Sequence, residues 1–239
     1  MLAITRRIGC SQTDAKARLS LKGAVDLMQD CSLFQLDSEK ELSRYFRENN
    51  VGMYLVSRQI DCIRMPEYGE EITTKTWVYE CKAAYGFRNT VLYDERGKAC
   101  VVTYATGAFV NLQTGRPVRM PRDVINTVPM EERAEMEYLP RKIKVPACAP
   151  MDKLPFKVLN MHADLNGHVN NAMYLAFAEE YLERDAEIKR VRVEYRNPAK
   201  PGEWIVPQIY QEENRMVAEL LNQARQSFAI VEFCLEKSG

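Results

Sequence analysis

The sequence is poor in the residues that build metal, phosphate and disulfide sites. Its 239 residues include two histidines, His162 and His168, which share one segment and lack further ligands at the spacings of zinc sites. Seven cysteines are scattered without a Cys-x-x-Cys pair, so we expect reduced cytosolic thiols. No glycine-rich phosphate-binding loop is present. The sequence therefore predicts no metal and no cofactor.

An excess of one charge and a long apolar run are also missing. Lys plus Arg and Asp plus Glu number 33 each, so the formal net charge is zero, which argues against nucleic-acid binding. No apolar run is long enough to cross a bilayer, and residues 1–9 alternate like a strand rather than forming a secretory signal. The hydrophobic fraction of 46% can supply a sizeable core. We expect a cytoplasmic globular protein that contacts neither nucleic acid nor membrane.

The hydrophobic pattern of the first half predicts two helices and five strands. The helices span about 20–33 and 38–49, and the strands span 2–8, 53–64, 71–82, 86–93 and 98–112. The turn at 94–97 joins the last two strands, and Gly97 suits a positive φ there. The proline-rich, charged segment 117–150 is typical of a connector.

The second half repeats this order. A strand is predicted at 156–161, a helix at 169–182, and strands at 187–196, 203–210, 215–221 and 227–235. When Gly69 is set on Gly202, each half has a strand, a proline-marked break and a Gly-Glu pair that opens the next strand. Two unrelated hairpins would give a similar pattern. The sharper interpretation is a duplicated unit, in which an antiparallel sheet wraps around one apolar helix.

The most informative segment runs from His162 to Asn171. It places Asp164, Asn166 and His168 directly before residues 172–178, which have almost no polar face and are typical of a buried helix. Polar groups at the start of such a helix need partners or a purpose. A helix start also offers unpaired backbone N–H groups and a partial positive charge, which can polarise a carbonyl oxygen.

In these residues the chain resembles the acyl-acyl carrier protein (acyl-ACP) thioesterases, the double hot-dog enzymes that end fatty acid synthesis. Segment 164–171 follows the family pattern Asp-x-Asn-x-His-Val-Asn-Asn position by position, and segments 65–70, 76–78 and 193–196 support the match. The resemblance implies an α+β tandem hot-dog fold with two antiparallel sheets, each wrapped around a long apolar helix. The expected parts are an N-terminal domain at 1–130, a connector at 131–150 and a C-terminal domain at 151–239.

The resemblance also implies an activity, namely hydrolysis of acyl-ACP to a free fatty acid and holo-ACP. Acyl carrier protein is then the expected partner, and a homodimer is a possible assembly. Two other functions stay open: a hot-dog thioesterase that acts on acyl-CoA, and a non-catalytic acyl-binding module on the same fold. Basic residues in the connector are candidates for docking an acidic carrier, with a solvated linker as the alternative: Arg116, Arg119, Arg122, Lys142 and Lys144.

Three residues of the motif are the predicted catalytic groups. His168 is the expected general base, since an imidazole titrates near neutral pH. Asn166 is expected to hold the water or the thioester oxygen through its amide. Asp164 is expected to orient Asn166 or His168, or to take the proton itself, with loop stabilisation as its structural alternative. We expect a single active site, because residues 15–20 before the first helix contain no matching set.

Four further residues are predicted to bind substrate. Asn170 and Asn171 stand at the helix start, where capping of the helix explains them at least as well. Tyr54 and Trp77 belong to first-half strands, where they could line the acyl site or simply pack in the sheet.

One departure from the family pattern affects the mechanism. Relatives often carry glutamate, sometimes followed by cysteine, where this chain has Pro198 and Ala199. Neither side chain can act as an acid, a base or a nucleophile. Water activation is then left to His168 or Asp164, or to a carboxylate such as that of Glu194 or Glu203.

Overall fold

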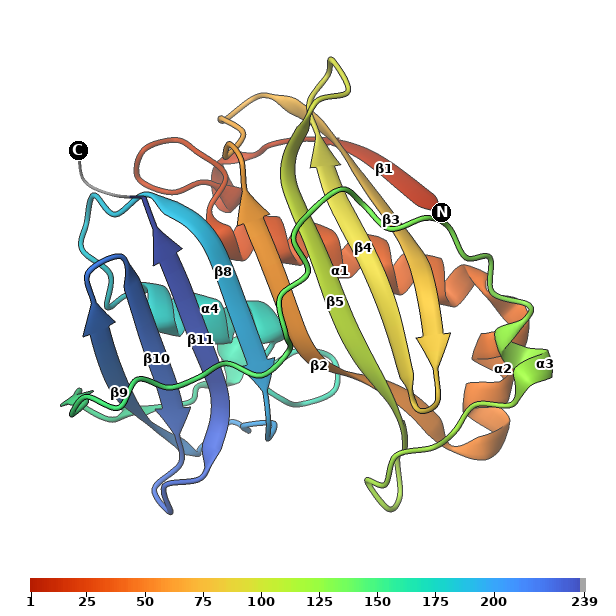
Figure 1. The fold of residues 1–239 in the computed structure, drawn as a ribbon. Helices are drawn as coiled ribbons and strands as arrows, with labels where there is room; N and C mark the ends of the chain where they lie inside the picture. Colours follow the sequence, from red (N-terminus) through yellow and green to blue (C-terminus); the bar gives the residue numbers. More distant parts are fainter. Residues whose placement is uncertain (237–239) are drawn as a thin grey trace. The chain divides into compact units, whose positions relative to one another are not determined.

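The structure is a computed structural model that describes residues 1–236 (Figure 1). It divides into two compact units, Met1–Tyr138 and Leu139–Gly239. The boundary therefore falls inside segment 131–150, the predicted connector. Each unit contains an antiparallel sheet with a helix packed against it, and helices are few, which is consistent with the predicted α+β hot-dog class. No helix in residues 1–236 is long and apolar enough to span a membrane.

The first unit is built on a five-stranded sheet in the order β1-β3-β4-β5-β2, with antiparallel neighbours throughout. The predicted elements are present with ends shifted by a few residues, and the short helix α3 lies where only connector was expected. The elements in chain order are β1 (Leu2–Arg7), η1 (Cys10–Gln12), α1 (Leu21–Ser38), α2 (Lys40–Asn49), β2 (Val51–Cys62), β3 (Glu71–Lys82), β4 (Tyr85–Tyr93), β5 (Ala99–Asn111) and α3 (Arg122–Ile125).

Helix α1 covers one face of this sheet (Figure 1). The Ser20 hydroxyl caps it by accepting a hydrogen bond from the Gly23 N–H at 3.0 Å. Ala24, Val25 and Met28 are fully buried. Each large apolar side chain buried in this way contributes about 1.5–3 kcal/mol of hydrophobic free energy. The helix therefore forms because its apolar face is held against the sheet.

The opposite face of the first sheet is covered by segment 131–138. Thr76 faces α1, where its hydroxyl lies 3.5 Å from that of Ser32, so its neighbour Trp77 points to the other side. There the Trp77 indole N–H donates to the Glu132 carbonyl at 2.7 Å, and the Gln59 amide donates to the Glu137 carbonyl at 2.7 Å. This part of the predicted connector is thus a strap fixed by side chains of the sheet.

The second unit has the strand order β8-β11-β10-β9-β6, and β7 also pairs with β9. Its helix α4 has nine residues against eighteen in α1, so it is shorter than the helix predicted at 169–182. The elements are β6 (Met151–Asp152), β7 (Phe156–Lys157), η2 (Asn160–His162), α4 (Asn171–Glu179), β8 (Ile188–Tyr195), β9 (Trp204–Glu212), β10 (Arg215–Leu221) and β11 (Ser227–Leu235).

A buried ion cluster fixes the chain before β6 to the second sheet. Glu232 lies between Arg192 and Arg215, at 2.5 and 2.6 Å. The two guanidinium groups also donate to backbone carbonyls of segment 140–144, Arg192 to Pro140 and Arg215 to Lys144. The carboxylate therefore holds the two arginines in the geometry that binds segment 140–144.

The two units repeat each other in backbone detail. The Ile8 N–H donates to the Glu70 carbonyl at 2.8 Å, and the Val158 N–H donates to the Glu203 carbonyl at the same distance. The Glu70 and Glu203 carboxylates each accept from the backbone N–H three residues earlier, at 2.8 and 2.6 Å. The two units therefore share these bonds at matching positions, which is what a duplicated unit predicts.

Candidate active site

The segment between η2 and α4 forms a tight turn that carries the predicted catalytic residues. An antiparallel bridge between Ala163 and Val169 closes its base. Within the turn the Asp164 N–H donates to the His168 carbonyl at 2.8 Å. Gly167 adopts a φ of 72°, in the left-handed region that favours glycine. The structure thus brings Asp164, Asn166 and His168 together on one turn.

The three side chains of this turn differ in what they contact. The Asp164 Oδ1 atom accepts the Asn166 backbone N–H at 2.8 Å, which is the bond of an Asx turn. The Asn166 amide is exposed and the His168 imidazole is partly exposed, and neither has a hydrogen-bond partner within residues 1–236. Asp164 is therefore occupied in holding the turn, whereas Asn166 and His168 are available to a ligand.

The start of α4 offers one backbone donor. Asn170 is the N-cap residue, and its side chain accepts the Ala172 N–H at 2.9 Å. The Met173 N–H donates to the Asn170 carbonyl at 2.9 Å. Among the first three helical residues, the Asn171 N–H is the one for which the described chain provides no acceptor. The capping role weighed for Asn170 is confirmed, and the helix start can donate to a developing oxyanion through Asn171.

The second histidine has a structural role. His162 Nδ1 accepts the Leu159 N–H at 3.1 Å, and its ring packs edge-on against Phe177 with the centroids 5.0 Å apart. In the neutral imidazole the proton then resides on Nε2. Gln12 makes the equivalent bond to the Gly9 N–H in the first unit, so the position supports η2 and does not require an imidazole.

Tyr174 is a buried polar residue of the site that sequence reasoning missed. Its hydroxyl accepts the Ala199 N–H at 2.8 Å, and the Ala199 carbonyl accepts the Val169 N–H at 2.8 Å. The pKa of Tyr174 is raised to about 12, mainly by burial; the Ala199 N–H bond lowers it and the nearby carboxylates of Glu203 and Asp164 add to the rise, so the phenol stays protonated. Ala199, at a position where relatives can carry a reactive side chain, thus supports the motif turn through its backbone.

The first unit builds the same turn with different side chains. Asp14 Oδ1 accepts the Lys16 N–H at 2.8 Å, and the Asp14 N–H donates to the Arg18 carbonyl at 2.7 Å. Ala17 takes the place of Gly167 with a φ of 58°. Lys16 and Arg18 stand where the second unit has Asn166 and His168, so this turn lacks the amide and the imidazole.

The two predicted substrate-binding aromatics occupy different environments in the first unit. Tyr54 lies on β2 and is 47% exposed. Trp77 lies on β3, is buried on the face away from α1, and donates its indole N–H to the strap. Sheet and strap packing accounts for Trp77, and contact of either residue with an acyl chain stays a prediction.

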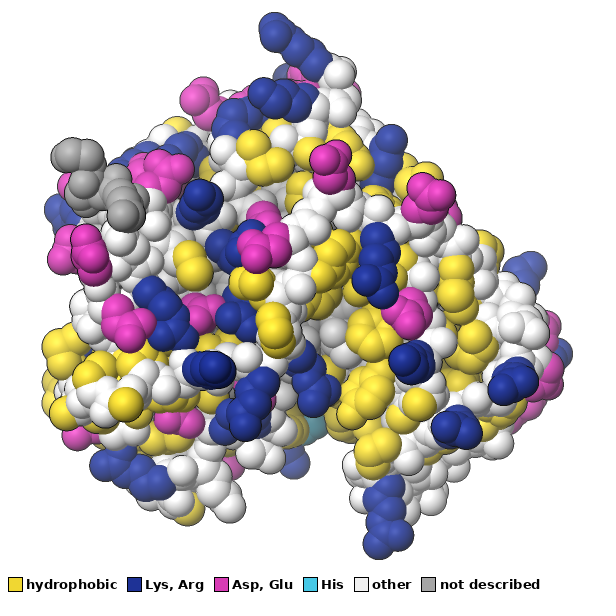
Figure 2. Space-filling view, viewed as in Figure 1, with side chains coloured by type: hydrophobic (Ala, Val, Ile, Leu, Met, Phe, Trp, Pro, Cys, Tyr) yellow, Lys and Arg dark blue, Asp and Glu magenta, His cyan; other side chains and the backbone are white. Residues whose placement is uncertain are grey.

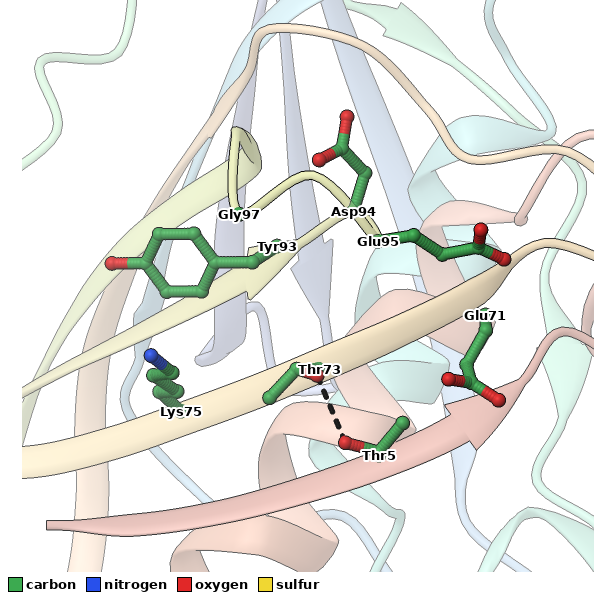
Figure 3. A pocket seen from close by; sticks show the side chains of 8 residues that line it. All are labelled: Thr5, Glu71, Thr73, Lys75, Tyr93, Asp94, Glu95 and Gly97. Carbon is green, nitrogen blue, oxygen red and sulfur yellow. Dashed lines mark hydrogen bonds between the residues drawn. The ribbon is translucent and has the colours of Figure 1, made fainter.

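A surface pocket of the first unit lies at the edge formed by β1, β3 and the β4–β5 turn (Figure 3). The hydroxyls of Thr5 and Thr73 lie 2.9 Å apart in it, and the Lys75 ammonium lies 5.0 Å from the centre of the Tyr93 ring. None of the predicted catalytic residues lines it. Within residues 1–236 no group of His, Cys, Asp and Glu side chains could hold a metal ion.

Charges are mixed on the surface. Figure 2 shows Lys and Arg side chains spread among Asp and Glu side chains on the face in view, as expected for zero net charge. The five connector bases are all exposed, and Lys142 and Lys144 lie on segment 140–144, which Arg192 and Arg215 hold. Carrier docking by these bases stays a prediction.

Comparison with known proteins identifies the family. Residues 6–128 match the acyl-ACP thioesterase N-terminal domain, and residues 148–232 match the acyl-ACP thioesterase C-terminal domain. The chain therefore belongs to the acyl-ACP thioesterase family, whose members are thioester hydrolases, and the resemblance seen in the sequence is confirmed. A comparison with curated protein sequences finds no match.

Solved structures show the same fold. An acyl-ACP thioesterase from Bacteroides thetaiotaomicron superposes with a TM-score of 0.88 at 20% identity, covering 98% of this chain and 97% of that one. A putative oleoyl thioesterase from Lactobacillus plantarum gives 0.84 at 20% identity, with 99% and 96% covered. The 12:0-ACP thioesterase from Umbellularia californica gives 0.80 at 15% identity, with 98% and 96% covered.

Proposed function

We propose that this thioesterase hydrolyses fatty acyl thioesters carried on acyl carrier protein, and that turn 164–168 of the second unit is its one active site. The observation that carries the proposal is that the Asn166 and His168 side chains have no hydrogen-bond partner within residues 1–236. They lie on the turn that leads into α4, where the Asn171 N–H also lacks an acceptor among these residues. An amide, an imidazole and a helix-start N–H are the groups that hydrolysis of a thioester requires. We also propose a tandem hot-dog arrangement. In it the second unit carries the catalytic groups and the first unit, its duplicate, lacks them.

In the proposed reaction His168 removes a proton from a water molecule as that water attacks the thioester carbonyl carbon. The negative charge that develops on the carbonyl oxygen is stabilised by the Asn166 amide and the Asn171 N–H. The carbon–sulfur bond then breaks, and the proton held by His168 passes to the leaving thiolate. One water is consumed, and one fatty acid and one carrier thiol are released. Asp164 supports this chemistry by holding the Asn166 backbone.

Asn166→Ala and His168→Ala are the variants that test this mechanism. Removal of a positioned base or an oxyanion donor costs on the order of 10²–10⁴-fold in turnover. Both side chains lack partners within the described chain, so the variants should unfold like the wild type in urea. Lys16→Ala and Arg18→Ala, at the matching positions of the first unit, are the controls and should keep most activity. A near wild-type rate in either second-unit variant would remove that residue from the mechanism.

The carrier and the activity itself are tested together by hydrolysis of matched acyl-ACP and acyl-CoA substrates of several chain lengths. A higher kcat/KM on acyl-ACP is expected, since the family acts on that substrate. A preference for acyl-CoA would favour the coenzyme A alternative. Binding without turnover would favour the acyl-binding module, for which the inert Pro198 and Ala199 are the motivating observation.

A cytoplasmic location completes the proposal. All seven cysteines are free thiols, which fits a reducing compartment. Fractionation of cells that produce the chain, with the thiols alkylated at lysis, would test this directly.

A further inference from the structure

Three large apolar side chains of segment 159–165 project into solvent, and this segment leads into turn 164–168. Leu159 is 50% exposed, Met161 82% and Leu165 87%. We call these three residues the turn apolar surface. Apolar side chains gathered on an exposed segment mark a surface that another molecule covers, because their hydration is unfavourable.

The fold itself does not require these three side chains. The first unit forms the same 3-10 turn and the same Asx turn, with Gly9, Ser11 and Ala15 at the corresponding positions. The bonds that define the two copies agree, since the Gly9 and Leu159 N–H groups each donate to a side chain three residues later at 3.1 Å. Large apolar residues are therefore a property of the copy that carries Asn166 and His168.

Exposed basic residues accompany the turn apolar surface. Lys157 lies two residues before Leu159 and pairs with Trp204, which is itself 40% exposed. Lys200 is exposed and follows Ala199, whose carbonyl holds the end of the turn at Val169. In the first unit an acidic residue, Glu67, occupies the position of Lys200. The occupant that fits is a protein with apolar side chains among acidic ones.

We propose that the turn apolar surface is the docking surface for the acidic carrier protein that presents the acyl thioester. The inference rests on the proposed function, since the carrier is the substrate of the same site. Leu165 lies between Asp164 and Asn166, so the turn apolar surface directly adjoins the residues that the thioester must reach. An acidic carrier, rather than a lipid or a second copy of this neutral chain, matches both the apolar residues and the two lysines.

The test is the double variant Leu159→Gly/Met161→Ser, which installs the residues of the first unit on the second and leaves turn 164–168 unchanged. We expect kcat/KM on acyl-ACP to fall on the order of 10- to 100-fold, as when central apolar contacts of an interface are removed. The rate on acyl-pantetheine, which has the thioester but no carrier protein, should change by less than about twofold. Ile63→Ser, which removes a 59% exposed apolar side chain from the first unit, is the control and should affect neither substrate.

Calorimetric titration of holo-ACP into the wild type and the double variant separates this inference from the proposed function. Weaker binding of holo-ACP by the variant supports the docking surface even if no turnover is detected. Absence of turnover in the wild type would count against the proposed function alone. An equal loss on acyl-ACP and acyl-pantetheine would overturn the inference, because it would show a local structural effect. So would a wild-type dimer that the variant converts to a monomer, or vesicle binding that the variant abolishes.

Discussion

Removal of the Tyr174 hydroxyl should destabilise the second unit by an amount that the structure lets us estimate. Tyr174→Phe leaves the Ala199 N–H without an acceptor, and Ala199 is fully buried. An unsatisfied buried N–H costs about 1–3 kcal/mol. In a chain of this size, that loss corresponds to a fall in Tm of roughly 2–12 °C. Urea unfolding followed by tryptophan fluorescence and circular dichroism measures the free energy directly.

The first unit suggests how to compensate for this loss. At the matching positions it has Ala24, with no hydroxyl, and Pro66, with no N–H, while the Pro66 carbonyl still accepts the Leu19 N–H at 2.6 Å. The double variant Tyr174→Phe/Ala199→Pro reproduces that pair in the second unit. It should therefore be more stable than the sum of the two single changes allows, by about 1 kcal/mol or more in a double-mutant cycle.

Tyr210→Phe is the matched control for the Tyr174 experiment. Tyr210 is a buried tyrosine of the same unit, and its hydroxyl forms no hydrogen bond with residues 1–236. Its loss should cost less than about 0.5 kcal/mol. Equal destabilisation by Tyr174→Phe and Tyr210→Phe, or strict additivity in the Tyr174–Ala199 cycle, would refute the argument that this hydroxyl satisfies the Ala199 N–H.

Two further predictions concern ion pairs. Glu232→Gln should cost about 3–5 kcal/mol, because it leaves Arg192 and Arg215 without their buried counter-charge, and limited trypsin digestion should then cut at 141–144 much faster than in the wild type. Arg64 holds the pKa of the Glu70 carboxyl below its usual range, so its stabilisation is present above about pH 4.3 and lost as the pH falls through the lowered pKa. Glu70→Gln should therefore flatten the pH dependence of the urea midpoint below about pH 4.5.

The elements with strong local signals could be predicted from the sequence. β3 spans residues 71–82 as predicted. Its alternating pattern lies between a Gly-Glu pair and a turn, and these two features define the ends of the strand. The Asp94–Gly97 turn formed as expected, with Gly97 at a φ of 76°. The predicted strand 156–161 was too long, because His162 caps a 3-10 turn at 160–162. That bond depends on tertiary placement, which the apolar pattern does not encode.

The site was predicted in its location but only partly in its roles. The motif located the turn, yet the match between Asp14 and Asp164 was missed, because α2 and the longer α1 displace the two turns relative to the strands that follow. Tyr174 could have been found, since it is the one polar-tipped residue in the apolar run 172–178. Its hydrogen-bond partner, the Ala199 backbone N–H, could not be predicted, because a backbone group is not indicated by the residue type.

The duplicated turn also decides how Asp164 should be tested. Asp14 and Asp164 accept equivalent backbone N–H groups at 2.8 Å, although only the second turn carries Asn166 and His168. If Asp164 acts by holding the turn, Asp164→Asn keeps the accepting oxygen and should retain most of kcat/KM, with an unchanged acid limb of the pH–rate profile.

Asp164→Ala removes that oxygen, so it should lower kcat and cost about 1 kcal/mol of stability. Asp14→Ala should cost a similar stability with activity intact. The contrary result is equally clear. If Asp164→Asn abolishes turnover while the variant unfolds like the wild type, the carboxylate itself takes the proton. The base role would then pass from His168 to Asp164, and the shared Asx turn would be an inherited framework on which a catalytic carboxylate was retained.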